Sequence, residues 1–385
     1  MSQITAAKRP AEIVREYIEA KFFHPHANPA SRLPTIQEFS RHLKVSPSTV
    51  RSVFKVLARE GRLDAVPGRG TFLVHSSGAD TPALHHCIGI NAAEAPMEGW
   101  WGSIFLGVTG EALKENIMVT ALGALRTADP SLTGVRKALD RVDGVIAFPD
   151  LGHAHEIDGI CAENNLPVVH VNPTRFHATA NFASNDYFGF AHHLALAWRG
   201  SGRRKIVLVM AAPVTESVSS AQTYSAFALA FASCPDARIE VLEDTRPAHR
   251  FSSVSMEMGR HLMKGHLEKQ GPEEVDAVYC FGDLLAEGAM RELLQAGRSV
   301  PGDVSVVGGT GLKTVKHDSF HLVSMKQPMR TIGEAAAKML IERIRNQSQD
   351  APGIYLMPEL GEGNTIRPEE RAAFQRSLRQ DRELL

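Results

Sequence analysis

Two helix starts and a glycine-rich turn follow one another closely between residues 33 and 74. Thr35 has a glutamate, Glu38, three positions later, and this capping-box pattern predicts a short helix. Ser46 followed by Pro47 predicts a second helix start, because a serine oxygen caps free backbone N–H groups and proline suits the first helical position. Two short helices joined by so brief a turn are typical of a helix-turn-helix.

The second of these helices has two chemically different faces. Apolar residues recur at i, i+3, i+4 and i+7 from Val50 to Leu57, so this face is expected to pack on a core. The opposite face carries hydrogen-bond donors and no acidic residue: Ser48, Arg51, Ser52, Lys55 and Arg59. Because the DNA major groove is lined with acceptors and flanked by phosphates, we expect this face to enter it.

The segment 62–73 predicts two short strands around the turn Pro67-Gly68-Arg69-Gly70. Glycine lets the backbone approach phosphates closely, and Arg69 at the tip is expected to enter the narrow minor groove. With the two helices, this hairpin predicts a winged helix-turn-helix that binds double-stranded DNA. One alternative stays open: a small helical domain with a hairpin, whose basic face is merely solvated.

This stretch resembles the GntR family of bacterial transcription regulators. The shared pattern consists of Leu33-Pro34, VS..TVR from Val45 to Arg51, Leu57 with Gly61, and GRGTF from Gly68 to Phe72. Relatives often carry an arginine three positions after LP and another after VS; here Gln37 and Pro47 stand there, so two customary DNA-contacting donors are absent. The residues expected to contact DNA are Thr35, Gln37, Ser46, Ser48, Thr49, Arg51, Lys55, Arg59, Gly68, Arg69 and Gly70.

The distribution of charge supports a nucleic-acid partner for the first part of the chain alone. Residues 1–75 hold 12 Lys and Arg against 6 acidic residues, a net charge of +6, whereas the rest carries −7 of the total of −1. A basic module joined to an acidic one fits phosphate contact confined to the first. The acidic remainder would discourage nonspecific binding to DNA.

Length and composition bound the rest of the molecule. A chain of 385 residues suits two or three domains, 43% hydrophobic residues can fill a core, and no run is long enough to cross a membrane. The first residues do not resemble a signal peptide. Four cysteines are scattered without a CxxC pair, which predicts reduced thiols and a cytoplasmic location: Cys87, Cys161, Cys234 and Cys280.

After a polar linker at 76–86, short apolar runs alternate with helical patterns, which predicts an α/β fold with parallel sheets covered by helices on both faces. Six phrases in order resemble the LacI/GalR effector domain, of the type I periplasmic-binding-protein fold: VDGVIAFP, LPVVHVN, SNDYFG, RRKIVLV, VDAVYCFGDLLAEGAMRELLQAG and VPGDVSVVGG. A GntR-type DNA-binding domain (the head) followed by such an effector domain is similar to the domain order of arabinose-responsive regulators.

The resemblance implies a domain plan. We expect a winged helix-turn-helix at 1–75, the linker at 76–86, a two-lobed effector-binding domain at 87–358, and a tail helix at 359–385. Within the effector domain, the N-lobe is expected at about 87–197 and 327–358, and the C-lobe at about 198–326. Such lobes bind a small molecule between them, at the carboxyl ends of their strands.

By family position, ten residues are expected to line this effector site: Trp100, Trp101, Phe148, Asn172, Asn185, Asp186, Thr223, Asp283, Thr310 and Gln327. The tandem tryptophans, in a loop after the first strand, suit stacking on a sugar or another flat ring, although both could instead be buried in the core or a subunit interface. Sugar-binding relatives place an Arg near Thr223, an Asn before Asp283 and an Asp near Thr310, and all three are absent here. A degenerate pocket without a ligand also stays open.

Other patterns in the sequence do not support a metal site, a nucleotide site or an active site. The histidine clusters lack metal-ligand spacing, the glycines at 308–311 lack the dinucleotide-binding spacing, and no catalytic motif stands out, so we expect no metal, no cofactor and no enzyme. The sequence predicts a homodimeric transcription regulator, a repressor, whose affinity for a pseudo-palindromic operator depends on a carbohydrate-related effector. The alternatives are a small-molecule-binding protein with a vestigial or protein-docking head and, behind it, an enzyme built on the lobes.

Overall fold

A computed structural model divides the chain into two compact units, residues 1–85 and 86–385, each described here by itself. Residue 85 thus separates the units, while the expected linker at 76–86 lies outside the described part. The structure describes residues 10–22, 33–59, 62–66, 70–73, 87–91, 99–122, 138–148, 154–173, 181–243, 255–311, 316–317, 320–346 and 353–384.

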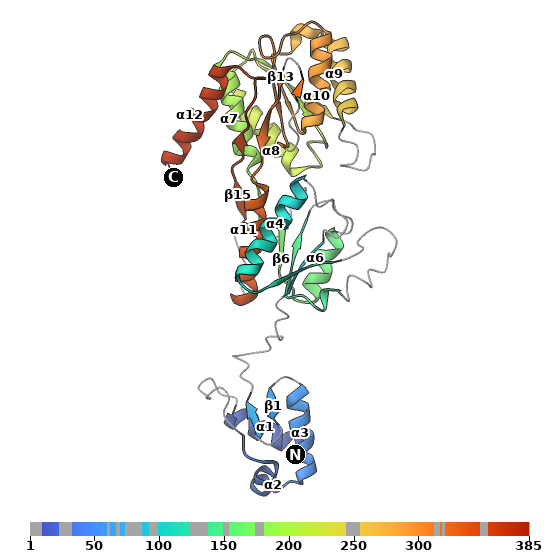
Figure 1. Ribbon diagram of the computed structural model, residues 1–385, viewed down its shortest axis with the longest axis vertical. Coiled ribbons are helices and arrows are strands. Elements are labelled where there is room, and N and C mark those ends of the chain that lie inside the picture. Colours follow the sequence, from blue (N-terminus) through green and yellow to red (C-terminus); the bar gives the residue numbers. More distant parts are fainter. Residues whose placement is uncertain are drawn as a thin grey trace, which may run out of the picture. The chain divides into compact units, whose positions relative to one another are not determined.

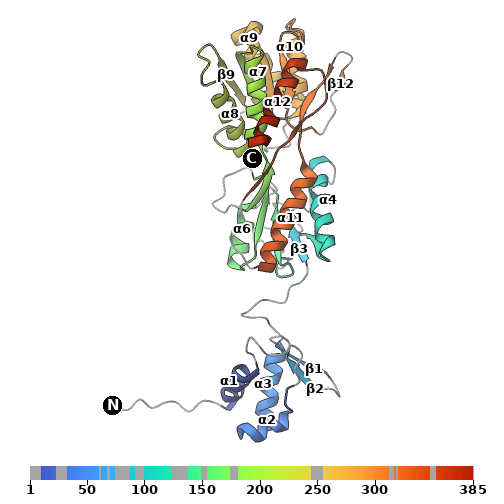
Figure 2. The same ribbon diagram turned by 90° about the vertical axis from the view of Figure 1, so that its left-hand side faces the viewer.

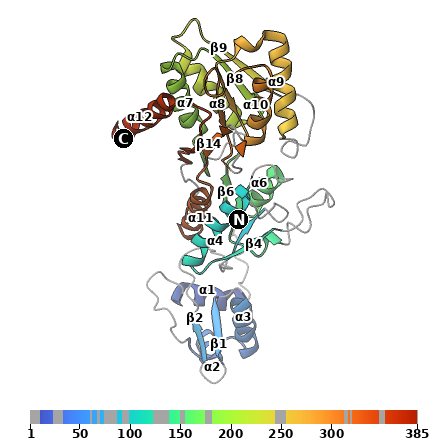
Figure 3. The ribbon, with the colours of Figure 1, turned by 45° about the horizontal axis from the view of Figure 1, so that its top comes forward.

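The described part of the first unit contains three helices and a two-stranded antiparallel hairpin (Figures 1 and 3). Its elements are α1 (Pro10–Phe22), α2 (Ile36–Leu43), α3 (Pro47–Arg59), β1 (Leu63–Val66) and β2 (Gly70–Leu73). The predicted capping box is confirmed: the Glu38 backbone N–H donates to Thr35 Oγ1 at 3.3 Å, and the Thr35 N–H donates to Glu38 Oε2 at 2.7 Å. Likewise, Ser46 Oγ accepts a hydrogen bond from the Thr49 backbone N–H at 3.1 Å and so caps α3.

The second unit consists of two lobes, each built on a six-stranded sheet. The first lobe has strand order β15-β7-β6-β5-β3-β4, with every pair parallel. Two helices, α4 and α11, lie side by side along one face (Figure 2), and α6 packs on the other. Its elements are β3 (Cys87–Ile90), α4 (Gly99–Lys114), β4 (Met118–Ala121), β5 (Gly144–Ala147), α6 (Ala154–Glu163), β6 (Val168–Val171), β7 (Phe182–Asn185), α11 (Met329–Asn346) and β15 (Ile354–Leu356).

The second lobe has strand order β16-β14-β11-β10-β8-β9, parallel except for β16. Its elements are α7 (Tyr187–Gly200), β8 (Lys205–Met210), α8 (Val218–Phe231), β9 (Arg238–Glu243), α9 (Met256–Gln270), the short 3-10 helix η1 (Pro272–Glu274), β10 (Ala277–Cys280), α10 (Asp283–Gln295), β11 (Ser305–Gly308), β14 (Val323–Lys326), β16 (Glu359–Leu360) and α12 (Pro368–Leu384). A separate small hairpin joins β12 (Lys316–His317) and β13 (Phe320–His321).

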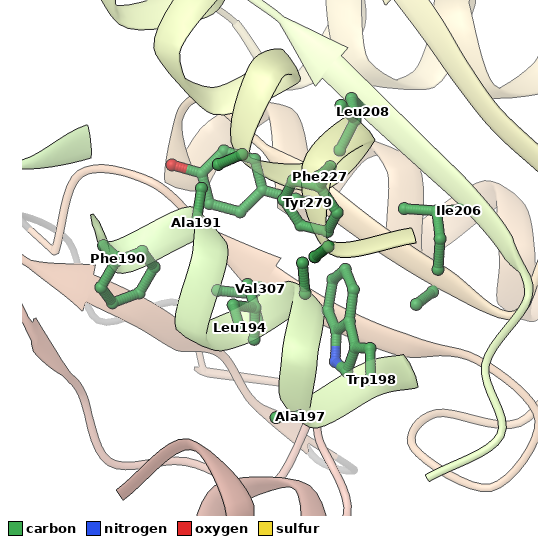
Figure 4. Close-up of a cluster of buried hydrophobic side chains, with 14 of the residues drawn as sticks. Phe190, Ala191, Leu194, Ala197, Trp198, Ile206, Leu208, Phe227, Tyr279 and Val307 are labelled. Atoms are coloured by element: carbon green, nitrogen blue, oxygen red, sulfur yellow. The ribbon is translucent and has the colours of Figure 1, made fainter. Parts of the chain in front are cut away.

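Buried side chains on both faces of this sheet explain why its strands read as continuous apolar runs. Alternate residues point to opposite faces. On one face, α7, α8 and α12 cover a core in which Trp198, Phe227 and Tyr279 pack in sequence, with ring centroids 5.6 and 6.2 Å apart (Figure 4). On the other face, α9 and α10 cover Val207 and Val278 (Figure 3).

The structure corrects the expected lobe boundaries. Helix α7 packs on the core of the second sheet, so the first crossing between lobes lies at Asn185–Asp186 and not near residue 197. The segment after residue 358 is not a separate tail, because β16 pairs with β14 and α12 buries Phe374 against α7. The expectation differed from the structure because α12 buries an apolar face. Such a face is hard to recognise in so charged a sequence.

A buried ion pair anchors this C-terminal segment. Arg203 Nε donates to Glu370 Oε1 at 2.8 Å, and their side chains are 4% and 0% exposed. Glu370 also accepts hydrogen bonds from Ser305 Oγ at 2.6 Å, Ser201 Oγ at 3.1 Å and the Arg367 N–H at 2.8 Å. The network lies at the amino ends of β8 and β11.

Candidate DNA-binding surface and effector site

The exposed face of α3 has the composition that the sequence predicted. Ser48, Arg51, Ser52 and Lys55 are exposed, whereas Val50, Val53, Phe54 and Leu57 are buried in the core of the first unit. Helix α3 has no acidic residue in its sequence. An exposed arc of donors on a helix fixed by its apolar side can reach acceptors and phosphates in a groove.

Hydroxyl groups at the start of α3 are ordered by one another. Ser46 Oγ lies 2.7 Å from Ser48 Oγ and 2.8 Å from Thr49 Oγ1. This start of α3 is the positive end of the helix, where phosphate groups bind favourably. The first turn of α3 is therefore suited to a backbone phosphate.

One acidic side chain of the first unit, on helix α1, forms hydrogen bonds with arginine side chains. Glu19 of α1 accepts hydrogen bonds from Arg62 Nη1 at 2.6 Å and from Arg15 Nε at 3.1 Å. These contacts fix α1 to the residue that precedes the hairpin. They neutralise a carboxylate that would otherwise oppose phosphate binding.

The other residues predicted to contact DNA differ in what the structure says of them. Gln37 is exposed on α2, and Thr35 uses its hydroxyl in the capping box. Gly70 begins β2 with φ 118°, a conformation that favours glycine. Gly68, Arg69 and the side chain of Arg59 lie outside the described residues.

In the second unit, the crossing between lobes brings several predicted effector residues together. Asn172 Oδ1 accepts hydrogen bonds from the Asn185 N–H at 2.9 Å and from Ser184 Oγ at 3.2 Å. Asn185 Nδ2 donates to Gln327 Oε1 at 2.7 Å, and Gln327 Nε2 donates to the Gly309 carbonyl at 2.6 Å. Gln327 therefore joins the carboxyl end of β7 in one lobe to that of β11 in the other.

A second group gathers at the carboxyl ends of β10, β11 and β14. Asp283 Oδ1 accepts hydrogen bonds from Ser324 Oγ at 2.5 Å and from the Thr310 N–H at 3.1 Å. The Asp283 N–H donates to Thr310 Oγ1 at 3.3 Å. Asp283 is 2% exposed, and among the described residues its Oδ2 has no hydrogen-bond partner.

Two further predicted polar residues have different surroundings. Asp186 caps α7, because its Oδ1 accepts a hydrogen bond from the Gly189 N–H at 2.7 Å. Thr223 on α8 is fully buried, and no group in the described part of the chain forms a hydrogen bond with its hydroxyl. Asp186 thus has a structural task that explains its position, whereas no contact explains the hydroxyl of Thr223.

The predicted aromatic residues lie at the carboxyl edge of the first sheet. Trp101 is half-buried and packs on Phe148, with ring centroids 4.9 Å apart. Both tryptophans belong to the first turn of α4, not to a loop as expected, although the side chain of Trp100 lies outside the described part. Apolar contact with α4 and α11 explains the helical placement.

Tyr187, which was not among the predicted effector residues, lies in the same region. Its hydroxyl accepts a hydrogen bond from Asn185 Nδ2 at 3.2 Å, and its ring centroid lies 5.6 Å from that of Phe281, two residues before Asp283 in the sequence. Burial raises the pKa of Tyr187 to about 12, an effect that the bond from Asn185 partly opposes. Tyr187 lies within SNDYFG, one of the segments that resemble the LacI/GalR effector domain, and this resemblance could have pointed to it.

The described residues offer neither a metal-binding cluster nor a membrane-spanning helix. Among them, no cluster of three or more His, Cys, Asp or Glu side chains is placed to bind a metal ion. None of the described helices combines the length and apolarity that a membrane crossing requires.

Comparisons with known proteins agree with this architecture. Residues 10–73 match the family described as bacterial regulatory proteins, gntR family, and residues 196–366 match the periplasmic binding protein-like domain. One relative, the "HTH-type transcriptional repressor PurR" of Vibrio campbellii, is 35% identical over 91 residues, which cover 24% of this chain and 27% of that protein. This chain thus matches about a quarter of that relative's length.

Solved structures share the fold. The transcriptional regulator CelR in complex with cellobiose has a TM-score of 0.58 and 19% identity, covering 86% of this chain and 100% of that one. A LacI family regulator from Enterococcus faecium with bound ribose has a TM-score of 0.56 and 18% identity, covering 73% and 99%. The chain therefore consists of a GntR-family helix-turn-helix domain followed by a periplasmic-binding-protein-like domain with the fold of LacI-family regulators.

Proposed function

We propose that this chain is a DNA-binding transcription regulator, a repressor, controlled by a small-molecule effector. The observation that carries the proposal is the exposed donor face of α3, with Arg51 and Lys55, in a helix-turn-helix that continues into a two-lobed unit. Arg51 and Lys55 would contact phosphates or guanine edges, and Ser48 would lie near base edges. Arg69 in the hairpin turn would enter the minor groove.

Control by a ligand is supported by the crossing between lobes. Asn185, Gln327 and Gly309 form a hydrogen-bonded chain from one sheet to the other, so a change in lobe angle must alter it. A ligand that prefers one arrangement of the lobes shifts the equilibrium by its difference in affinity, typically about 1–3 kcal/mol. The similar structures with cellobiose and ribose support a carbohydrate-related effector.

The proposed assembly is a cytoplasmic homodimer without catalytic activity. Two heads would bind half-sites of a pseudo-palindromic operator one or a few helical turns apart. A similar structure, the lac repressor, is a dimer bound to its operator. Effector binding in each subunit would then change the spacing of the two heads.

The test first isolates the genomic DNA fragments that the purified full-length protein retains. Its affinity for these fragments is then measured at increasing salt concentrations. Arg51→Ala should weaken binding by about 1–3 kcal/mol and lower the slope of log affinity against log salt by about 1. Arg291→Ala, on exposed α10 surface, is the control for loss of one positive charge and should bind as the wild type does. Wild-type binding that does not weaken as salt rises would favour a vestigial or protein-docking head.

A further inference from the structure

Three of the predicted effector residues have buried oxygen atoms without hydrogen-bond partners in the described part of the chain. The atoms are Asn185 Oδ1, Thr223 Oγ1 and Asp283 Oδ2, and the residues are 0%, 0% and 2% exposed. An unpartnered buried polar atom costs about 1–3 kcal/mol, and more when it is charged. All three can accept a hydrogen bond, and two of them can do nothing else.

The topology places these atoms at facing edges of the two sheets. Asn185 ends β7, Asp283 directly follows the turn after β10, and Thr223 lies in the second turn of the helix that follows β8. The carboxyl ends of parallel strands meet at one edge of a sheet. The hydrogen bond between Asn185 and Gln327 brings the edge of the first lobe to that of the second.

Asp283 stands at the amino end of α10, which favours its negative charge, but it lacks an ion pair within the described part of the chain. None of the described Lys, Arg or His side chains forms an ion pair with it, and the donors to its Oδ1 are the neutral Ser324 hydroxyl and Thr310 N–H. A buried carboxylate without an opposite charge is strongly unfavourable. A ligand that brought a positive charge would remove this cost, whereas an anionic ligand would increase it.

The first lobe adds aromatic surface at its own carboxyl edge. Trp101 is half-buried against Phe148 at this edge. The faces of aromatic rings attract cations, tryptophan most strongly. Carboxylate and aromatic rings together are the usual surroundings of a bound ammonium group.

We propose that the effector is a small molecule that carries a protonated amine and hydroxyl donors, as an amino sugar does. Its ammonium group pairs with Asp283 Oδ2, and its other donors reach Asn185 Oδ1 and Thr223 Oγ1. Phosphorylated and carboxylated sugars are excluded by repulsion from Asp283. This inference rests on the proposed effector control and specifies the ligand class at the same site.

The first experiment needs no ligand. Asp283→Asn keeps an acceptor for Ser324 and Thr310 and removes the uncompensated charge, so the unliganded full-length variant should melt about 2–4 °C higher than the wild type. Asp303→Asn is the matched control, because Asp303 is exposed and hydrogen-bonded to the Ser299 N–H at 2.8 Å and Ser299 Oγ at 2.7 Å. The control should melt no higher than the wild type. An unchanged or lower melting temperature for Asp283→Asn overturns the proposal.

The second experiment is calorimetric titration of the full-length protein with three matched probes: glucosamine, glucose and glucuronate. Glucosamine should bind at least about 30-fold more tightly than the other two, and Asp283→Asn should remove this preference. Equal or tighter binding of glucose or glucuronate contradicts the proposal. If none of the three binds, the melting shift of Asp283→Asn alone decides.

The two proposals fail in different ways. Salt-dependent DNA binding with a wild-type preference for glucuronate would overturn the ligand class and leave the regulator intact. Absence of DNA binding with a clear amine preference would overturn the regulator and leave the ligand class intact.

Discussion

Two buried carboxylates at opposite ends of the second sheet have contrasting surroundings. Glu370, at the amino end, is fully buried and accepts hydrogen bonds from four groups, one of them the guanidinium of Arg203. Asp283, at the carboxyl end, is nearly as buried, but only one of its oxygens has hydrogen-bond partners among the residues that the structure describes. The two carboxylates are therefore similarly buried, but they differ in the hydrogen bonds that their oxygen atoms accept.

The difference shows how one sheet separates stability from binding. A fully paired buried charge fixes the chain around it, whereas a partly paired one costs stability that a ligand can recover. Strained or unsatisfied groups gather at functional sites for this reason. The amino edge of the second sheet therefore holds α12, and the carboxyl edge is where we propose that the effector binds.

The largest expected effect comes from removing the satisfied carboxylate. Glu370→Ala leaves Arg203 buried without its opposite charge, so the free energy of unfolding of the second unit should fall by about 3–5 kcal/mol. Urea denaturation of the full-length chain measures it. Glu369→Ala, one residue earlier and exposed, should change stability by less than about 0.5 kcal/mol. Equal effects of the two variants would contradict the contrast between the edges.

A smaller loss is expected from a hydroxyl in the same network. Ser305 Oγ donates to Glu370 Oε2 at 2.6 Å and accepts from Arg203 Nη2 at 2.7 Å, so Ser305→Ala should cost about 1.5–3 kcal/mol. Ser201→Ala is the graded comparison, because Ser201 is half-buried and lies 3.1 Å from Glu370. Denaturation curves that rank Ser201→Ala as the more harmful change would show that the network is not centred on Glu370.

Much of the local structure could be predicted because it depends on neighbours in sequence. The capping box at Thr35 and Glu38, the cap at Ser46 and the apolar face of α3 each involve residues within one or two turns. Alternation of apolar runs with helical patterns likewise predicted the parallel sheets. Local hydrogen bonds and periodicity leave direct traces in a sequence.

What could not be predicted depends on contacts between distant residues. The pair Arg203–Glu370 joins residues 167 positions apart, and the bond from Asn185 to Gln327 joins residues 142 apart. Family position named Asn185, Asp283 and Gln327 as effector residues, but only the fold reveals that Gln327 is engaged at both ends. Tyr187 was missed because its contact with Phe281 joins residues far apart in the sequence.

The contrast between structural and functional polar groups extends to the first unit. Thr35→Ala removes the capping box of α2 and should lower the stability of that unit by about 1 kcal/mol. Gln37→Ala, two residues later and exposed, should leave stability unchanged and is expected to weaken DNA binding alone. Thermal melting and gel-shift titration of both variants separate the two effects. A stability loss from Gln37→Ala would show that it belongs to the fold.

The smallest expected effect concerns the contact between α7 and α12. His193 is 2% exposed, its Nδ1 lies 2.8 Å from Ser377 Oγ, and burial lowers its pKa below the ordinary 6.5, although Asp381 partly opposes the shift. The unfolded chain therefore binds the proton more readily, so stability that is present at pH 7 should decline as the pH falls below about 6.5.

His193→Gln should weaken this decline relative to the wild type when melting temperatures are compared between pH 7 and pH 5.5. His261→Gln, on the exposed surface of α9, should follow the wild-type profile. If the His193 variant lost as much stability on acidification as the wild type does, the acid sensitivity would arise elsewhere. The docking of α12 would then depend on the Arg203–Glu370 pair and on the buried ring of Phe374.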